Sequence, residues 1–478
     1  MRILFKVLII SALLIPNSYG FYGHITRDTI WRDTVLITGD VVVDSGVCLR
    51  IEPGTVVRFI NRLDVEPALI VNKGRLEAIG LPEDSIFLIE EGYKWTGIKF
   101  LHSRSNSLQY VRVRHAEGGV SCDSSSSLII KNSFIGPIPE GGVGVSCGYK
   151  SDVLLRDCVI ELYGKFIAPG SNQTGIRGCY AESISVINSI ITNCRGGDAD
   201  WGWPPDEIIP AGNGLGISCK DCKKVLIYSC TIKDIKGGDG VGSRHSDTIY
   251  AYPGNAYGIF LSNTSGEIKN TKILNVYGGG YDIGSLAYSY GRQGYGVGMM
   301  LSGNSEVVIG GSSEDQVDIY HNESYNLINN TPNDIIATYN YWGSTNPDTI
   351  AKYIFDKEDS SDLGRVIYKP WTEHPLGIGE KIKDKGKRIK LSVYPNPFRR
   401  KIEIRWEMSK KSSEPLKIYD ISGRLVRAFA RTQNQEPKAY KIFWYGRDDK
   451  GERLPQGVYF IKAENSIEKV ILLGGDDD

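Results

Sequence analysis

The chain contains 478 residues, with 56 basic and 56 acidic side chains. This balance excludes a chain-wide field of the kind that draws proteins to nucleic acid or to anionic membranes, so neither partner is expected. The sequence has 55 glycines and only 4 methionines, and its apolar residues seldom recur at helical spacing, which indicates a mainly β structure with many turns.

Residues 1–20 have the pattern of a secretory signal peptide. Arg2 and Lys6 precede an apolar run from Val7 to Ile15, and small residues follow up to Gly20. Such a run is too short to span a bilayer. We expect export with cleavage near Gly20. No later segment has a comparable apolar length, so we expect no membrane span after signal removal.

A short phrase recurs through the middle of the chain: a glycine, a short apolar stretch, a polar spacer and an alternating apolar run. Its copies begin at Gly119, Gly144, Gly175, Gly216 and Gly258. A unit this short cannot bury its own apolar face, so the copies must stack on one another. Because the apolar residues alternate, each copy should form two or three brief strands. The sequence therefore predicts a parallel β-solenoid over residues 34–375.

The nine cysteines are expected to pack as free thiols. One slot of successive repeats holds Cys122, Cys147 and Cys219, and a second slot holds Cys158 and Cys230. Residues in one slot stack about 4.8 Å apart along the solenoid axis, where a small apolar thiol packs well. Disulfides between neighbouring coils are the alternative. Cys219-x-x-Cys222 resembles half of a zinc knuckle, but no second pair of ligands follows, so no metal is expected.

The two ends of the solenoid carry distinctive phrases. Near the start are Ile51-Glu-Pro-Gly54, Gly74-Arg-Leu-Glu-Ala-Ile-Gly80 and Trp95-Thr-Gly-Ile98; near the end are Asn340-Tyr-Trp-Gly343 and Val366-Ile-Tyr-Lys-Pro-Trp371. These phrases resemble the first coils and the closing segment of bacterial secreted proteins of the pectate-lyase-like superfamily. The resemblance implies an all-β fold, a right-handed parallel β-helix. That architecture carries lyases, hydrolases, adhesins and proteins without known activity, so function has to come from particular residues.

Three insertions follow successive repeats at the same point and open at Gly196, Gly237 and Gly278. Insertions at equivalent points of neighbouring coils emerge on one edge, so we expect a continuous surface. Aromatic ring faces suit the apolar face of a pyranose, and charged groups suit its hydroxyls, which makes a polysaccharide or surface glycan the expected ligand. The candidate ligand-binding residues are Trp201, Trp203, Tyr250, Tyr252, Tyr281 and Tyr288. The alternatives are that these rings only pack the loops onto the coils below, or that they contact another protein.

A catalytic function would need acid and base groups at defined geometry. The candidate residues are Asp198, Asp239, Arg244, His245 and Asp282. A pectate lyase would use a calcium-binding carboxylate cluster and a basic residue, so Ca²⁺ is the one cofactor that this alternative implies. The paired-carboxylate signatures of a β-helix polygalacturonase do not occur in the solenoid. A binding or structural, adhesin-like protein without a cofactor is therefore the main hypothesis, and a polysaccharide lyase or glycoside hydrolase is the alternative.

The composition changes after Pro375. Residues 376–390 are rich in lysine and broken by glycine, which predicts a linker. Beyond them, short alternating apolar segments are separated by turn signals such as Asp448 to Gly451. This pattern predicts a small antiparallel β-sandwich over residues 391–473, a length that can support its own core.

Four phrases of this last segment are distinctive: Tyr394-Pro-Asn-Pro-Phe398, Ile418-Tyr-Asp-Ile-Ser-Gly-Arg-Leu-Val426, the run from Trp444 to Gly451, and Leu454-Pro-Gln-Gly-Val-Tyr-Phe460. They resemble the C-terminal sorting domain of the type IX secretion system and, more broadly, the immunoglobulin-like domain of flagellar hook-capping proteins. The resemblance implies that secretion machinery recognises residues 391–473 and that the protein reaches the cell surface or the medium.

Overall fold

The computed structural model describes residues 20–61, 66–92, 94–138, 141–162, 168–201, 208–241, 253–282, 293–376, 392–394, 398, 400–406, 416–420, 425–429, 440–463 and 466–472. The chain divides into two compact units, Met1–Glu380 and Lys381–Asp478. The expected signal peptide (1–20) and linker (376–390) lie outside the described residues, apart from Gly20 and Leu376.

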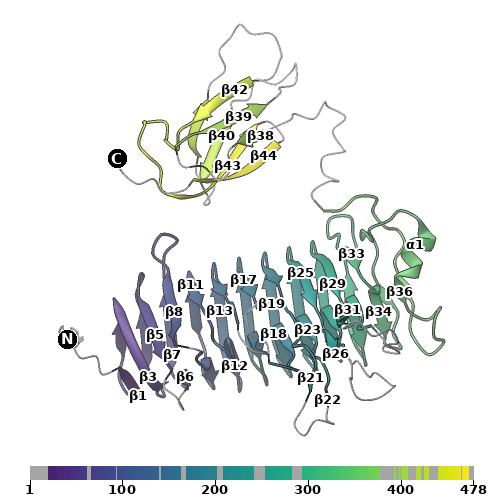
Figure 1. Ribbon diagram of the computed structural model, residues 1–478, viewed down its shortest axis with the longest axis horizontal. Coiled ribbons are helices and arrows are strands. Elements are labelled where there is room, and N and C mark those ends of the chain that lie inside the picture. Colours follow the sequence, from purple (N-terminus) through teal and green to yellow (C-terminus); the bar gives the residue numbers. More distant parts are fainter. Residues whose placement is uncertain are drawn as a thin grey trace, which may run out of the picture. The chain divides into compact units, whose positions relative to one another are not determined.

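The first unit is a parallel β-helix whose coils stack along one axis (Figure 1). Each full coil contributes one short strand to each of three faces. Face 1 contains β6 (Ala68–Asn72), β9 (Gly97–Leu101), β12 (Val120–Asp123), β15 (Val143–Cys147), β18 (Gln173–Cys179), β23 (Gly214–Lys220), β27 (Ala256–Ser262), β31 (Gly296–Ser302), β34 (Tyr325–Asn330) and β36 (Ile354–Phe355).

The other two faces follow in chain order within each coil. Face 2 contains β2 (Thr29–Trp31), β4 (Cys48–Ile51), β7 (Arg75–Ile79), β10 (Asn106–Gln109), β13 (Ser127–Lys131), β16 (Asp152–Arg156), β19 (Ser183–Ile187), β24 (Lys224–Tyr228), β28 (Ser265–Lys269), β32 (Glu306–Ile309), β35 (Ile335–Ile336) and β37 (Val366–Ile367). Face 3 contains β5 (Val56–Ile60), β8 (Ile86–Glu91), β11 (Val111–Val113), β14 (Phe134–Ile135), β17 (Val159–Glu161), β20 (Ile190–Thr192), β25 (Thr231–Lys236), β29 (Lys272–Tyr277) and β33 (Asp318–Asn322).

The solenoid begins earlier than the expected start at Thr34. Strand β1 (Phe21–Ile25) pairs in parallel with β3 (Thr34–Val43), and β2 pairs with β4. These first strands are short and largely exposed, so the apolar alternation that marks later coils is weak there. Strand β3 is long enough to serve two faces, since its first half pairs with β5 and its second half with β6.

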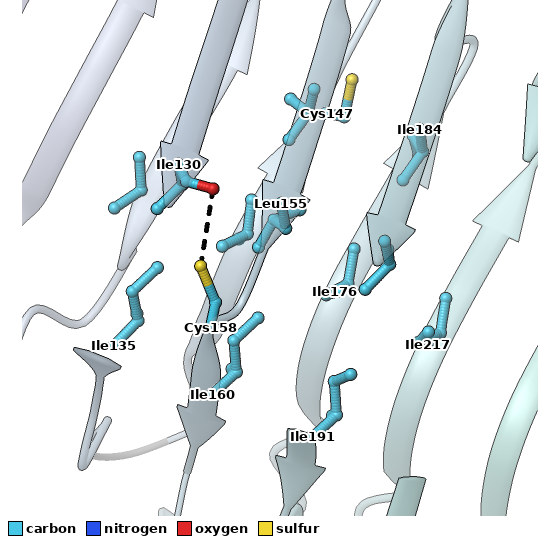
Figure 2. Close-up of a cluster of buried hydrophobic side chains, with 14 of the residues drawn as sticks. Ile130, Ile135, Cys147, Leu155, Cys158, Ile160, Ile176, Ile184, Ile191 and Ile217 are labelled. Carbon is cyan, nitrogen blue, oxygen red and sulfur yellow. Dashed lines mark hydrogen bonds between the residues drawn. The ribbon is translucent and has the colours of Figure 1, made fainter. Parts of the chain in front are cut away.

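The core consists of columns of inward side chains, one from each coil. On face 1 one column runs through Val145, Ile176, Ile217 and Ile259, which are register partners and fully buried. Figure 2 shows part of this packing, with isoleucines of several strands directed into one interior. Burying such a side chain contributes about 1.5–3 kcal/mol relative to leaving it exposed. The parallel sheets confirm the predicted right-handed parallel β-helix class for this unit.

The cysteines lie where the repeat spacing places them. Cys122 and Cys147 are register partners on face 1, and all nine cysteines are free thiols, seven of them buried. The Cys158 thiol donates a hydrogen bond to the Ile130 carbonyl at 3.5 Å (Figure 2). Burial raises the pKa of Cys122 to about 12 and that of Cys158 to about 11, so both stay protonated and act as small apolar groups.

A single left-handed residue turns the chain from face 2 to face 3. The residues at this position are Tyr110, Asn132, Asp157, Asn188, Ser229 and Asn270, with φ between 46° and 56°. Asparagine and aspartate tolerate this conformation better than most residues, which explains their frequency in the column. Because the turn has the same shape in successive coils, the strands on either side of it stay in register.

The C-terminal end of the solenoid is closed by α1 (Pro347–Lys352) and by the segment after β37. Asn346 caps the helix, since its side chain accepts the amide hydrogens of Asp348 and Thr349. Asn340 is fully buried and accepts the Val317 amide hydrogen at 2.8 Å while donating to two backbone carbonyls. The phrase Asn340-Tyr-Trp-Gly343 therefore has a structural role.

The second unit has two antiparallel sheets. One contains β38 (Ser392–Tyr394), β39 (Ile402–Trp406) and β42 (Tyr440–Trp444); the other contains β40 (Leu416–Asp420), β41 (Leu425–Phe429), β43 (Gly457–Ala463) and β44 (Ser466–Leu472). Phe398, Trp444 and Ile461 are buried in one shared core. The Tyr459 hydroxyl donates to the Pro455 carbonyl at 2.6 Å and fixes the entry to β43. The small antiparallel β-sandwich predicted from the sequence is confirmed.

Candidate functional site

The three insertions leave the solenoid between face 3 and face 1 through necks made of glycine. Each neck joins an entering glycine to a closing glycine: Gly197 with Gly212, Gly238 with Gly254, and Gly279 with Gly294. Within each neck the closing amide donates to the entering carbonyl, at 2.7 Å, 2.9 Å and 3.1 Å in chain order. Between necks, Gly238 donates to Gly212 at 2.9 Å and Gly279 donates to Gly254 at 2.8 Å. One unbroken series of backbone hydrogen bonds thus links all three insertions.

No side chain fits at these positions. A Cβ atom at Gly254 would lie 1.8 Å from the Gly212 carbonyl oxygen, and one at Gly279 would lie 1.8 Å from that of Gly238. The entering glycines directly follow the predicted openings of the insertions at Gly196, Gly237 and Gly278, but the closing glycines, Gly212, Gly254 and Gly294, were not predicted. Their signal was available, because each lies two residues before a face 1 strand.

The bases of the insertions continue outward as a small stacked ledge, here called the flange (residues 196–201, 237–241 and 278–282). In the first insertion β21 (Asp200–Trp201) pairs with β22 (Ile208–Ile209) as an antiparallel hairpin. In the next two, β26 (Gly240–Val241) and β30 (Tyr281–Asp282) pair in parallel. The Ala199 amide donates to the Asp239 carbonyl at 2.8 Å, which joins the first base to the second. The insertions therefore emerge on one edge of the solenoid (Figure 1).

Asparagines line the side of the necks nearest face 1. The Asn213 amide donates to the Asn172 side-chain oxygen at 2.6 Å, the Asn255 amide to that of Asn213 at 2.8 Å, and the Tyr295 amide to that of Asn255 at 2.9 Å. Each side chain satisfies a backbone donor of the next coil. This ladder fixes the edge where the flange meets face 1.

Two of the candidate catalytic carboxylates meet in the flange. Arg195 Nη2 lies 2.8 Å from Asp198 Oδ1 and 3.1 Å from Asp239 Oδ2, and Lys236 Nζ lies 2.9 Å from Asp239 Oδ2. The same aspartates also accept backbone hydrogen bonds: Asp198 Oδ1 from the Asp239 amide at 2.8 Å, and Asp239 Oδ1 from the Gly280 amide at 2.7 Å. The carboxylates therefore tie successive coils together.

The environment of Asp239 favours its charged form. Burial raises the pKa of this carboxyl, but hydrogen bonds from Lys236 and from the Gly280 amide, together with the charge of Arg195, outweigh burial and lower it. A general acid near neutral pH needs a raised pKa. The geometry thus suits Asp239 to holding the flange together.

The other candidate residues are placed less fully. Asp282 lies in β30 opposite Val241, two residues beyond the position equivalent to Asp198 and Asp239, and only its backbone is described. The backbones of Trp201 and Tyr281 pair with Ile208 and Gly240. The remaining candidates, Trp203, Arg244, His245, Tyr250, Tyr252 and Tyr288, lie outside the described residues.

A second feature, missed from the sequence, lies on the outer surface of face 1. Phe260, Met300, Ile328 and Phe355 are successive register partners and half-buried, one from each of the last four coils of this face. Two tyrosines flank this column: the Tyr257 ring lies 5.6 Å from that of Phe260, and the Tyr325 ring lies 5.9 Å from that of Phe355. We call these six residues the face 1 strip.

The strip has a signal in the sequence. The same outward column holds Ser121, Ser146, Arg177 and Ser218 in the preceding coils. The repeat pattern is defined by the inward residues on either side of this column, such as Ile259 and Leu261, and so it does not reveal the outward residue between them. The change from Gly-Ile-Ser at 216–218 to Gly-Ile-Phe at 258–260 marks where the outer surface becomes apolar.

In the part of the chain that the structure describes, no group of three or more histidine, cysteine, aspartate or glutamate side chains is arranged to hold a metal ion. None of the helices in that same part has the length and apolar character needed to cross a lipid bilayer.

Residues 392–472 match the family model of the secretion system C-terminal sorting domain. The match confirms the resemblance of the last segment to a type IX sorting domain. The protein is therefore exported and is either displayed at the cell surface or secreted. Comparison with curated protein sequences finds no match.

Several solved structures are loosely similar. The A-module of mannuronan C-5 epimerase AlgE4 from Azotobacter vinelandii is 12% identical over 71% of this chain and 89% of that chain, with a TM-score of 0.33. Latent PorU from Porphyromonas gingivalis is 20% identical over 18% of this chain and 9% of that chain, with a TM-score of 0.15. The surface protein and adhesin PfbA from Streptococcus pneumoniae is 12% identical over 66% and 84%, with a TM-score of 0.19. Superpositions this loose carry no argument about activity.

Proposed function

We propose that this exported β-helix protein, which carries a sorting domain at residues 392–472, binds an extended polysaccharide along the face 1 strip. The observation that supports this function is the run of four outward apolar side chains on successive coils, flanked by two tyrosine rings. Aromatic and apolar side chains cover the apolar faces of sugar rings, while polar neighbours bond their hydroxyls.

The spacing of the strip suits a polymer. Adjacent parallel strands lie about 4.8 Å apart, so the strip offers one apolar contact per coil along the axis. A linear polysaccharide lying along that axis would contact one more apolar side chain at each successive coil. A surface that binds a folded protein would not require its apolar side chains to be aligned in a single column.

Polar groups lie near the first coil of the strip. Tyr257 follows the closing glycine Gly254 by three residues, and its side chain hydrogen-bonds with Asn255. Lys236 precedes the neck of the same coil and is half-buried, whereas half-buried Arg195 and exposed Asp198 belong to the coil before it. Sugar hydroxyls at the edge of the strip would find donors and acceptors there.

An enzyme acting on the same polysaccharide is the alternative. It is supported by the meeting of Asp198 and Asp239 around Arg195. Against it, one oxygen of each aspartate accepts a backbone amide and both aspartates are ion-paired, so neither Asp198 nor Asp239 is poised to transfer a proton. Binding without turnover is therefore the function that we propose.

The test uses the residue that the same column carries in earlier coils. Replacing Phe260 and Met300 with serine should weaken polysaccharide binding about tenfold, because each lost contact is worth about 0.5–1.5 kcal/mol and 1.4 kcal/mol corresponds to a factor of ten. The melting temperature should barely change, because the side chains point outward. Ile129→Ser is the matched control, since Ile129 is 40% exposed on face 2.

Binding would be measured on a polysaccharide array with full-length protein. Equal binding by the wild type and the Phe260→Ser/Met300→Ser variant would contradict the proposal. Shortening of a bound polysaccharide, or a new unsaturated end, would instead favour the enzyme.

A further inference from the structure

The turn after β23 carries the one C-x-x-C pair of the sequence, Cys219 and Cys222. Neither residue belongs to the strip or the flange. Cys219 is the last inward residue of the strand, and Cys222 follows the turn; their exposed fractions are 0% and 2%. Between them Asp221 adopts a left-handed conformation with φ 54°, which folds the chain tightly back on itself.

The two sulfur atoms share one space. Gly178 is the register partner of Cys219 in the preceding coil. A Cβ atom at Gly178 would lie 2.9 Å from the Cys222 sulfur and 3.0 Å from the Cys219 sulfur, so the two sulfurs are at most about 5.9 Å apart. The other cysteine pair of this column differs, because Cys122 and Cys147 stand on separate coils. Glycine at 178 thus leaves room that both thiols of one turn occupy.

The electrostatics of the pair give the two sulfurs different roles. The hydrogen bond between the thiols lowers the pKa of Cys222, and amide contacts from Ala181 and Lys220 act in the same direction against burial. The same hydrogen bond raises the pKa of Cys219, and burial adds to the increase. Cys222 is therefore the thiol that more readily supplies a thiolate.

We propose that Cys219 and Cys222 form a disulfide within this turn when the exported chain folds in the presence of a protein dithiol–disulfide oxidant. The Cys222 thiolate attacks one sulfur of the oxidant's disulfide, which forms a mixed disulfide and releases one oxidant thiolate. The Cys219 sulfur, on losing its proton, then attacks the Cys222 sulfur and displaces the second oxidant thiolate. The two protein thiols are oxidised, the oxidant becomes a dithiol, and both protons pass to it.

Burial of Cys219 and Cys222 determines the stage of folding at which the disulfide can form. In the folded coil both thiols are shielded from a protein-sized oxidant, so the disulfide forms while the coil closes. Cys122, Cys147, Cys158 and Cys230 are equally buried but lack a partner in the same turn, and they remain thiols. The result is a single disulfide within one turn, while the other buried cysteines of the solenoid remain reduced.

The test is thiol mapping of the full-length exported protein, purified without reductant, denatured and alkylated. Cys219 and Cys222 should be recovered in one linked peptide, with alkylation reduced to roughly a tenth or less of that at Cys147. In Cys222→Ser, which places a hydroxyl like those of the register neighbours Thr264 and Ser305, Cys219 should alkylate fully. Reduced, folded wild type should react with oxidised glutathione far more slowly than protein that refolds in its presence.

Three results would overturn the proposal. The first is full alkylation of both residues in exported protein. The second is a Cys147–Cys219 linkage, which would show that the space over Gly178 joins two coils instead. The third is equal protection of Cys122 and Cys147 in the denatured protein, which would show that oxidation is general and is not specific to this turn.

Discussion

The early and late coils of face 1 share an interior but differ on the outside. Their inward column continues without a break through Val145, Ile217 and Ile259. Their outward column changes from Ser146 and Ser218 to Phe260 and those that follow it. Two of the three insertions precede late coils, at β27 and β31, and the first precedes β23. Inward positions are fixed by the need to stack, whereas outward positions are free to change. This freedom allows one stretch of a uniform solenoid to carry the apolar strip that we propose as a binding surface.

The inward and outward columns should respond very differently to the same change. Ile217→Ala should lower the free energy of unfolding by about 3 kcal/mol, because it leaves a cavity between Ile176 and Ile259. The neighbouring Ser218→Ala faces outward and should change it by less than about 0.5 kcal/mol. Denaturant unfolding of the two variants measures the contrast. Similar losses of unfolding free energy in the two variants would contradict the distinction between the inward and outward columns.

The necks of the insertions permit a sharper version of this test. Gly279→Ala should cost about 2–3 kcal/mol, since its Cβ would lie 1.8 Å from a backbone oxygen that cannot move freely. Gly280→Ala is the matched control in the same insertion, because its nearest contact is the Asp239 side chain at 3.6 Å. Equal stability of the two alanine variants would show that the flange is not held through its glycines.

The ion pairs of the flange should contribute less, and their contribution should depend on pH. Asp239→Asn should cost about 1–2 kcal/mol at neutral pH, because hydrogen bonds to a charged group are lost. The folded-state pKa of Asp239 is lowered, so this stabilisation is present above the ordinary aspartate pKa of about 3.9 and disappears as pH falls through the lower folded value. Melting curves at several pH values should show the two proteins converging in acid.

The exposed Asp362 gives the control for that series. Asp362→Asn should leave the melting temperature close to that of the wild type at neutral pH. A gap between wild type and Asp239→Asn that stays constant into acid would contradict the role of the carboxylate charge.

The sequence reveals the parts of this molecule that depend on local pattern. Alternation and repeat length place Cys122 and Cys147 in one column, and turn residues separate the strands of both units. The closing glycines were harder to find, because the contact between Gly254 and Gly212 joins residues of successive coils that are far apart in the chain, and its steric demand appears only when coils stack. The strip was missed because Phe260 in a single repeat is an ordinary strand residue.

The candidate residues in the insertions show a different limit. Asp198 and Asp239 were candidates whose separation the sequence did not fix. Both contact Arg195 in the structure, and their partners Arg195 and Lys236 precede the insertions and were not considered. The candidate ligand-binding residues Trp203, Tyr250, Tyr252 and Tyr288 lie outside the described residues, so their role stays a prediction.

The most direct measurement is the affinity of the full-length protein for linear oligosaccharides of increasing length, taken from a polysaccharide that binds on the array. Affinity should rise as each sugar is added until the ligand spans the four coils that carry Phe260, Met300, Ile328 and Phe355, and then level off. The Phe260→Ser/Met300→Ser variant should lose that dependence on length. Binding that is independent of length, or that is unchanged in the variant, would contradict a polysaccharide site along the strip.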